Sequence, residues 1–226
     1  MRILIVEDHQ MMNDLLAKIC AEELGHELVA KVATGREAVS ETLRTNPDLV
    51  ILDLMLPDVD GFEVAGKIRA RGSNARILAV SSRCDANTVF RVEQARLDGF
   101  IDKKTSMLEE FRRAIADMAA GKPHFSESFM TLQRKRRHNS TAFDRLLTPN
   151  QQEVLTLIGD MLTDQAIATR LKLSIFTAEK HRYRIMEKLG LKTRAELVKY
   201  ARQNGFRSLS ESEFPDNGGH SGPLNK

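Results

Sequence analysis

Residues 49–53 read Leu-Val-Ile-Leu-Asp, four apolar residues closed by a carboxylate. An apolar run of this length, without polar alternation, is typical of a strand that is buried on both faces of a sheet. Residues 3–8 (Ile-Leu-Ile-Val-Glu-Asp) and 77–81 (Ile-Leu-Ala-Val-Ser) repeat the pattern of an apolar run that ends on polar groups. The first half of the chain is therefore predicted to contain a parallel sheet between two layers of helices.

Helical patterns separate these runs, so that strand and helix alternate five times. Parallel strands need such crossovers, and the alternation predicts an α/β fold with five parallel strands and helices on both faces. The expected strands are 2–7, 27–33, 48–53, 76–81 and 98–102, and the expected helices are 9–24, 35–45, 60–71, 85–96 and 105–119.

Polar side chains gather where the expected strands end. Glu7 and Asp8 follow the first strand, Asp53 ends the third, Ser81 the fourth, and Lys103 follows the fifth. Ligands bind beyond the carboxyl ends of such strands, and crowded carboxylates repel one another unless a cation lies between them. An all-oxygen set of this kind suits Mg2+, which leaves one carboxylate free to attack phosphorus. The hydroxyl and the ammonium can bind phosphoryl oxygens.

The second half has only helical periodicity, with expected helices at 149–161, 164–171, 175–189 and 193–204. A short helix, a tight turn and a second helix with a polar and basic face form a geometry that fits the major groove of DNA. Spacing alone leaves open a small helical bundle whose charged face is merely solvated.

Charge divides the chain in the same way. Residues 1–122 hold 17 Lys+Arg and 20 Asp+Glu, a net charge of −3, and residues 123–226 hold 17 and 11, a net charge of +6. A basic half suggests a polyanionic partner. The sequence has no apolar run long enough for a membrane span, and its two cysteines lack metal or redox spacing. A cytoplasmic protein without membrane contact is expected.

Two segments interrupt the periodic pattern. Residues 121–146 contain a basic run, Arg134-Lys135-Arg136-Arg137, and are interpreted as a flexible interdomain linker, with contact to DNA phosphates as the alternative. Residues 208–226 are rich in Ser, Gly, Pro and Asn and are predicted to be a disordered tail.

Residues 1–120 resemble the receiver domain of response regulators, which has the flavodoxin-like fold. The resemblance rests on Ile3–Asp8, on Asp53–Gly61 and on single residues near the ends of the fourth and fifth strands. It implies that a sensor histidine kinase phosphorylates Asp53. The other roles that it implies are Mg2+ binding by Glu7, Asp8, Asp53 and the backbone carbonyl of Met55, a switch formed by Ser81 and Phe100, and phosphoryl binding by Lys103.

Residues 147–207 resemble a LuxR-type helix-turn-helix, which with the receiver indicates the NarL/FixJ family of response regulators. The matching residues include Leu147-Thr148-Pro149, Ser174, Thr177, His181 and Lys188-Leu189. The resemblance implies binding of double-stranded DNA and a homodimer in the active state, with the last helix as the dimer contact of the DNA-binding domains. The DNA-binding residues that it implies are Thr177, Glu179, Lys180, Tyr183, Arg184 and Lys188.

Four residues depart from these patterns. Arg96 and Met161 stand where glycine is usual, Arg182 where an aliphatic residue is common, and Glu179 where lysine is common. A glycine lets a helix end in a left-handed turn, and Arg96 stands in that place at the end of the expected fourth helix. Arg182 is expected to extend its guanidinium to solvent.

The leading hypothesis is a two-component response regulator and transcription factor, in which phosphorylation of Asp53 frees a DNA-binding face covered by the receiver and favours dimerisation. Such a protein accepts and slowly hydrolyses its own aspartyl phosphate and is not a turnover enzyme. One alternative is a regulator that binds DNA as a constitutive dimer without phosphorylation. The other is a phosphotransferase or phosphatase built on a similar acidic pocket.

Overall fold

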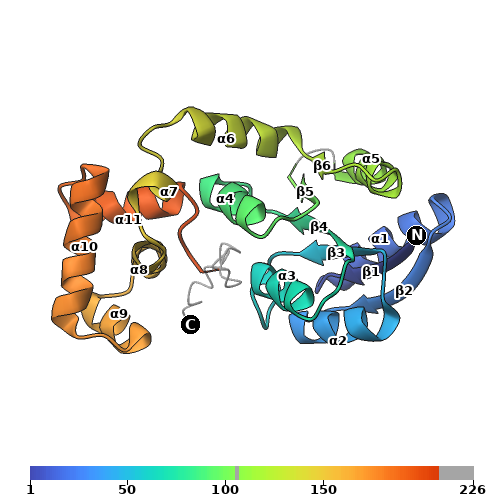
Figure 1. Ribbon diagram of the computed structural model, residues 1–226, viewed down its shortest axis with the longest axis horizontal. Helices are drawn as coiled ribbons and strands as arrows, with labels where there is room; N and C mark the ends of the chain where they lie inside the picture. The colour runs from blue at the N-terminus through green and yellow to red at the C-terminus, as the bar shows by residue number, and fades with distance from the viewer. Residues whose placement is uncertain (105–106, 209–226) are drawn as a thin grey trace, which may run out of the picture.

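The computed structural model describes residues 1–104 and 107–208, in which an α/β domain is followed by a small helical domain (Figure 1). The sheet is parallel throughout, with the strand order β2-β1-β3-β4-β5-β6. Its strands are β1 (Arg2–Val6), β2 (Glu27–Val32), β3 (Leu49–Asp53), β4 (Arg76–Ser81), β5 (Gly99–Asp102) and β6 (His124–Phe125). The predicted fold class is confirmed, but the sheet has six strands rather than five.

Helices cover both faces of this sheet. The domain contains α1 (Gln10–Lys18), the π-helical turn η1 (Ile19–Glu23), α2 (Gly35–Thr45), α3 (Gly61–Ala70), α4 (Ala86–Gln94) and α5 (Met107–Ala119). Side chains alternate across a strand. Ile3 and Ile5 of β1 therefore pack in the core beneath α1 and α5, whereas Leu4 and Val6 pack in the core beneath α2, α3 and α4. The continuous apolar runs are buried because both faces are covered.

The segment 121–146 differs from the expected flexible linker. It contains β6, the helix α6 (Glu127–His138) and the short helix α7 (Phe143–Leu146). Phe129 of α6 is fully buried; its ring lies 5.2 Å from that of Phe100 and stacks on Phe125 at 4.9 Å. The basic run lies in α6, where Arg136 pairs with Glu93 and Asp144 and Arg137 pairs with Glu93. The apolar side of this helix holds it against the receiver, so the linker interpretation was wrong in this respect.

Four helices follow α7 and enclose a separate core. They are α8 (Pro149–Gly159), α9 (Asp164–Leu171), α10 (Ile175–Leu189) and α11 (Arg194–Gln203). Thr148 and Thr193 form capping boxes at α8 and α11, and the Ser174 hydroxyl accepts a hydrogen bond from the Thr177 amide at the start of α10. Lys172 adopts a left-handed conformation (φ 55°) in the turn between α9 and α10, which completes a helix-turn-helix.

Two residues that replace the usual glycines keep the backbone conformation that glycine would favour. Arg96, after α4, has φ 49°, and Met161, after α8, has φ 66°. Their turns close with the Arg96 amide donating to the Glu93 carbonyl and the Met161 amide donating to the Ile158 carbonyl. The end of α4 therefore keeps a left-handed turn, at a cost of about 1–2 kcal/mol for a residue with a side chain.

Some expectations fall outside the described residues. The predicted start of the fifth helix at 105–106 and the predicted tail from 209 onward belong to this category. Within residues 1–104 and 107–208, none of the helices has the length and apolar character needed to cross a bilayer.

Candidate functional site

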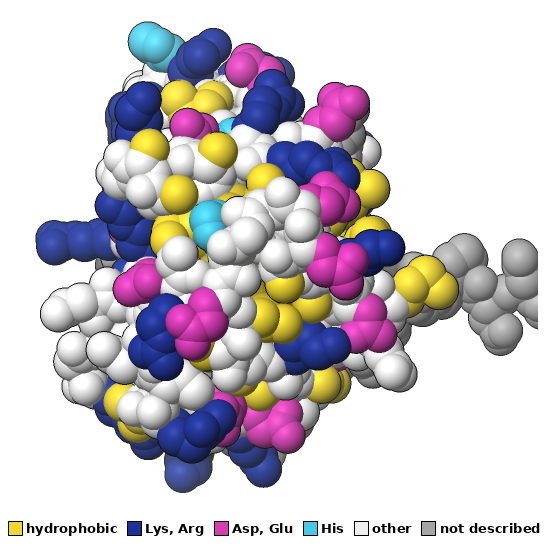
Figure 2. Space-filling model, turned by 90° about the vertical axis from the view of Figure 1, so that its right-hand side faces the viewer, with side chains coloured by type: hydrophobic (Ala, Val, Ile, Leu, Met, Phe, Trp, Pro, Cys, Tyr) yellow, Lys and Arg dark blue, Asp and Glu magenta, His cyan; other side chains and the backbone are white. Residues whose placement is uncertain are grey.

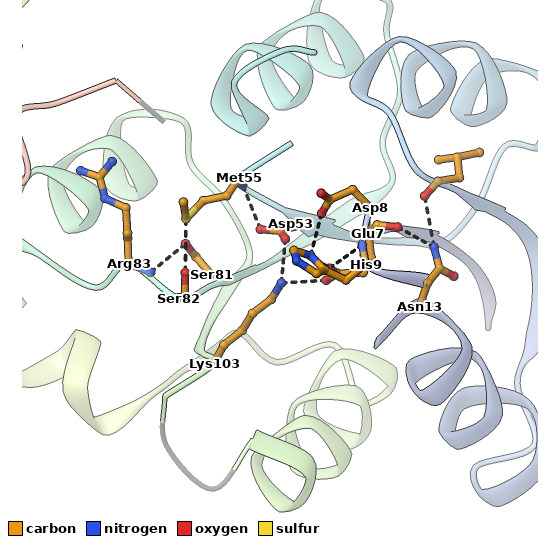
Figure 3. Close-up of polar contacts among 11 residues, drawn as sticks. Glu7, Asp8, His9, Asn13, Asp53, Met55, Ser81, Ser82, Arg83 and Lys103 are labelled. Carbon is orange, nitrogen blue, oxygen red and sulfur yellow. Dashed lines mark hydrogen bonds and ion pairs between the residues drawn. The ribbon is translucent and has the colours of Figure 1, made fainter. Parts of the chain in front are cut away.

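Asp53 and Lys103 meet in a pocket at the carboxyl ends of β3 and β5 (Figure 3). The Lys103 ammonium donates to Asp53 Oδ2 at 2.6 Å and to Glu7 Oε2 at 2.7 Å, and the Met55 amide donates to Asp53 Oδ1 at 2.8 Å. Asp53 and Glu7 are only 3% and 2% exposed. The sheet topology thus brings Glu7, Asp53 and Lys103 together, although Glu7 and Lys103 are 96 residues apart in the chain.

The loop after Asp53 is fixed by a close backbone approach. A Cβ at Gly61 would lie 2.5 Å from Leu54 Cα, so only glycine fits at this position. Asp60 caps α3 through the Phe62 amide and pairs with Arg91 of α4 at 2.8 Å. These contacts hold residues 54–60 over the pocket and connect the loop with α4.

Asp8 lies at the mouth of the pocket beside a histidine that the sequence reasoning did not select. His9 Nδ1 is 3.1 Å from Asp8 Oδ1 and 3.3 Å from Glu7 Oε1, so Glu7, Asp8 and His9 place possible metal ligands close together. Asp53 faces them from β3 across the Lys103 ammonium, as Figure 3 shows. The backbone carbonyl of Met55, the fourth predicted ligand, belongs to the loop that follows Asp53. His9 is adjacent to the acidic pair in sequence, and that adjacency was the signal available.

Burial and the Glu7 carboxylate raise the pKa of Asp53 to about 6, although the Lys103 ammonium and the Met55 amide oppose this change. Burial lowers the pKa of Lys103, but the carboxylates of Asp53 and Glu7 outweigh it and raise that pKa overall. Two buried carboxylates, Asp53 and Glu7, thus share one ammonium, and Asp8 lies next to Glu7 in the chain. The donor set fits a small divalent cation, which takes oxygen ligands and would relieve the repulsion between carboxylates.

Ser81 and Phe100, the predicted switch pair, are both buried. The Ser81 hydroxyl accepts a hydrogen bond from the Arg83 amide at 3.1 Å, and the Phe100 ring contacts Phe129. Phe100 is fully buried, and α6 covers its ring through Phe129.

The Arg83 side chain points away from the carboxylates and reaches the helical domain (Figure 3). It donates to the carbonyl of Gly205 at 2.7 Å, and the Asn87 side chain donates to the same carbonyl at 3.2 Å. The Asn87 amide donates to the carbonyl of Asn204 at 3.0 Å. Gly205 has φ 82°, which favours glycine, and a Cβ there would lie 2.0 Å from the Asp85 carboxyl group, which would have to move. Residues 204–207, just after α11, thus dock on the start of α4.

Aromatic rings extend the same contact. Phe90 of α4 meets Phe143 of α7 edge-on at 5.5 Å, and Phe143 meets Phe206 at 4.6 Å. The sequence reasoning selected neither Arg83 nor these rings, because no local pattern indicates which residues of two domains will meet.

The predicted DNA-binding residues lie on α10, away from the receiver (Figure 1). Phe176, Lys180 and Tyr183 border a shallow hollow of about 470 Å3 together with Glu179, Arg184 and Glu187. Tyr183 is 62% exposed, so the receiver does not cover this face in the structure. The expected covering of the recognition helix is absent from the arrangement described.

Three of the residues around this face have contacts within the domain. The Lys188 ammonium donates to the Leu146 carbonyl at 2.8 Å and to Gln151 Oε1 at 2.9 Å, so it braces α8. The Thr177 hydroxyl lies 2.8 Å from the Ser174 hydroxyl. Arg182 does not extend to solvent as expected: it pairs with Asp164 of α9 at 2.9 Å and lies over the Tyr183 ring at 4.5 Å. Hydrogen bonds from Arg194 and Arg182 outweigh burial and lower the pKa of Asp164, which keeps this pair charged.

The end of the receiver that faces away from the helical domain carries no field of a single sign. Figure 2 shows acidic and basic side chains interspersed there, with small apolar areas between them. This surface does not resemble a nucleic-acid site, in agreement with the acidic balance of residues 1–122.

Comparison with known proteins defines the class. Residues 3–116 match the response regulator receiver domain, and residues 145–201 match the bacterial regulatory proteins of the luxR family. The chain therefore belongs to the response regulators of the NarL/FixJ type, which join a receiver to a LuxR-type helix-turn-helix, and it is a DNA-binding transcription factor. Members of this family are regulators rather than turnover enzymes, and their receivers typically bind Mg2+ at the acidic pocket.

Particular similar proteins span from 61% to 91% of the chain. The response regulator protein VraR of Staphylococcus aureus is 28% identical over 205 residues, which are 91% of this chain and 98% of the relative. The solved structure of the RcsB–DNA complex covers 90% of this chain and 98% of its own, with a TM-score of 0.62 and 21% identity. A LuxR-family response regulator from Aurantimonas covers 61% of this chain and 98% of its own at 27% identity, with a TM-score of 0.57.

Proposed function

We propose that Asp53 accepts a phosphoryl group from a sensor histidine kinase and that this phosphorylation controls dimerisation and DNA binding. The observation that carries the proposal is the convergence of Asp53, Glu7 and Lys103 in one buried pocket. With a pKa of about 6, the Asp53 carboxylate is mostly ionised at neutral pH and is available as a nucleophile.

In the proposed transfer, an Asp53 carboxylate oxygen forms a bond to phosphorus while the bond from phosphorus to the donor imidazole nitrogen breaks. The nitrogen keeps the electron pair and takes up a proton. Lys103 turns from Asp53 toward the phosphoryl oxygens, and the Ser81 hydroxyl donates to one of them. Slow hydrolysis of the aspartyl phosphate then resets the protein.

Glu7, Asp8, Asp53 and the Met55 carbonyl are the proposed ligands of Mg2+. When bound, the metal would offset negative charge on the phosphoryl oxygens. The chain's own contribution is to place two carboxylates on one ammonium with a third carboxylate, Asp8, adjacent in the chain, an arrangement that gains stability from a second cation.

Labelling by acetyl phosphate in the presence of Mg2+ tests the site. Asp53→Asn should abolish incorporation of the phosphoryl group, while Asp14→Asn, which alters an exposed carboxylate paired with Lys31, should leave it unchanged. Incorporation that persists in Asp53→Asn would refute the assignment.

The proposed route from the pocket to the helical domain runs through the β4–α4 loop. Ser81 accepts from the Arg83 amide, and the Arg83 side chain donates to Gly205. A Ser81 hydroxyl drawn toward a phosphoryl group would give up its bond to the Arg83 amide and shift the Arg83 side chain. The docked arrangement would lose stability, which is a population shift toward separated domains.

On the DNA, we propose that Glu179, Lys180 and Tyr183 meet base edges and that Thr177 and Arg184 approach phosphates or groove edges. Lys188 would join them only by leaving Leu146 and Gln151. One solved RcsB structure consists of two dimers bound to two parallel DNAs, which supports a dimeric form for this chain as well. If duplex binding by Lys180→Ala plus Tyr183→Ala equals that of the unaltered protein, this face is misassigned.

One observation favours a second candidate, a regulator that binds DNA as a constitutive dimer. The recognition face is exposed although the domains are docked. Sedimentation and duplex affinity, measured with and without beryllofluoride and Mg2+, separate the two. An increase in the sedimentation coefficient or in the duplex affinity on addition of beryllofluoride supports phosphorylation control. Equal values with and without it support the constitutive dimer. In both cases the place of action is the cytoplasm, where kinase and chromosome are both accessible.

A further inference from the structure

An apolar cluster stands exposed at the start of the recognition helix. The structure describes eight large hydrophobic side chains as exposed, and four of them lie between residues 173 and 183: Leu173, Ile175, Phe176 and Tyr183. Phe176 is 70% exposed and takes no part in the core of the helical domain. Three of these four residues precede or open α10, and Tyr183 lies two turns further along the helix. Scattered exposed apolar residues are ordinary, but their concentration in one short segment indicates a contact surface.

Phe176 lies on the same face as the predicted base-reading residues. In an α-helix, positions 176, 180 and 183 follow the spacing i, i+4, i+7 and line one side. The residues that border the hollow on α10 are Phe176, Glu179, Lys180, Tyr183, Arg184 and Glu187. Phe176 is therefore the N-terminal member of the face that the helix-turn-helix presents to DNA.

The place of Phe176 in the first turn of the recognition helix of a luxR-family domain favours DNA as the occupant of this surface. Lys172 and Lys180 are exposed on either side of Phe176 in sequence, and Arg184 follows one turn later. Glu179 and Glu187 border the same hollow, so this face carries both signs of charge. Its cations can meet the phosphates of the groove walls, while the ring meets the one apolar group of the groove floor, the thymine methyl. The first residues of a recognition helix are those that reach the base edges.

We propose that Phe176 reads a thymine in each half-site through contact with its C5-methyl group. The inference rests on the proposed DNA-binding face and adds a base preference to it. Burial of one methyl group against the ring corresponds to about a fourfold gain in affinity.

The test uses a duplex selected from a random pool by the full chain, in which each thymine is replaced singly by deoxyuridine. This change removes the methyl group and leaves every hydrogen-bonding group in place. The unaltered protein should lose about fourfold affinity at one thymine per half-site. Phe176→Ala should bind the thymine and uracil duplexes equally, Phe176→Leu should keep part of the difference, and Met11→Ala, an exposed residue of the receiver, should behave as the unaltered protein.

The other results have separate meanings. Selection of no duplex, with or without beryllofluoride, overturns the DNA-binding face and the thymine contact together. A selected duplex whose uracil forms bind equally well, or lose the same affinity in Phe176→Ala, overturns the thymine contact alone. If Phe176→Ala instead changes the oligomeric state in sedimentation without altering discrimination, the ring serves a protein contact and the inference is wrong.

Discussion

Replacing Arg83 by alanine perturbs the contact between the receiver and residues 204–207. The Arg83 side chain is largely buried and donates a charged hydrogen bond to the Gly205 carbonyl at 2.7 Å. A hydrogen bond of this kind contributes roughly 1.5–3 kcal/mol. Because the Asn87 side chain still donates to the same carbonyl, we take about 2 kcal/mol as the loss, which raises the population of the undocked arrangement about 30-fold.

The amide of Asn87 reports this population directly. It lies in the first turn of α4, where no carbonyl of the same helix is available, and its partner is the Asn204 carbonyl of the other domain. Hydrogen exchange of this amide should therefore accelerate about 30-fold in Arg83→Ala, while amides of β3 keep their protection.

Arg69→Ala provides the matched control. Arg69 donates to the Ser73 and Ala75 carbonyls and pairs with Asp98, all within the receiver, so its loss should leave the Asn87 amide unchanged. An unchanged Asn87 exchange rate in Arg83→Ala, or an equal acceleration in both variants, would contradict the role assigned to Arg83.

Three further predictions concern single sites. In metal-free protein, Asp53→Asn should raise the free energy of unfolding by roughly 2–3 kcal/mol at pH 8, because a carboxyl group whose pKa is raised to about 6 disfavours the fold when it is ionised. This gain should shrink as the pH falls from about 6 toward 4. A gain that does not depend on pH in denaturant titrations would contradict the prediction. Arg96→Gly and Met161→Gly should each stabilise the protein by about 1 kcal/mol in the same titrations, because glycine adopts positive φ without strain, and destabilisation by either would show that the side chain matters more. Phe129→Ala should cost about 3 kcal/mol through the cavity left beside Phe100, and a loss below 1 kcal/mol would mean that α6 is not docked as described.

Much of the receiver could be predicted because burial on both faces leaves a direct trace in the sequence. The strands around Ile3–Val6 and Leu49–Leu52 are apolar throughout, and the polar groups that follow them must meet at one edge of a parallel sheet. Asp53, Glu7 and Lys103 are therefore recognisable as one group from the sequence.

The helix α6 could not be predicted because its composition is mostly polar and basic, with little apolar periodicity. Four consecutive basic residues near its end suggested a solvated linker, whereas a single buried ring, Phe129, with Phe125 before it, fixes the helix on the sheet. The ion pairs with Glu93 depend on a helix 40 residues or more earlier in the chain, and sequence periodicity carries no information about such contacts.

In the helical domain too, local features could be predicted from the sequence and contacts between helices could not. Its caps at Thr148 and Thr193 and its helix spacing are local features that the sequence displays. The pairing of Arg182 with Asp164 and the engagement of Lys188 with α8 arise from packing between helices, and they alter which side chains are available to DNA.

The ring of Phe90 has a consequence for dividing this chain into fragments. Phe90 belongs to α4, yet it packs with the core of the helical domain through Phe143. A receiver fragment that ended at residue 120 would present this ring to water and would also lack Phe129, the cover of Phe100. The complementary fragment would uncover Phe143. The two matched segments thus share an apolar contact across α4, and cutting the chain between them exposes rings that the whole chain keeps in contact.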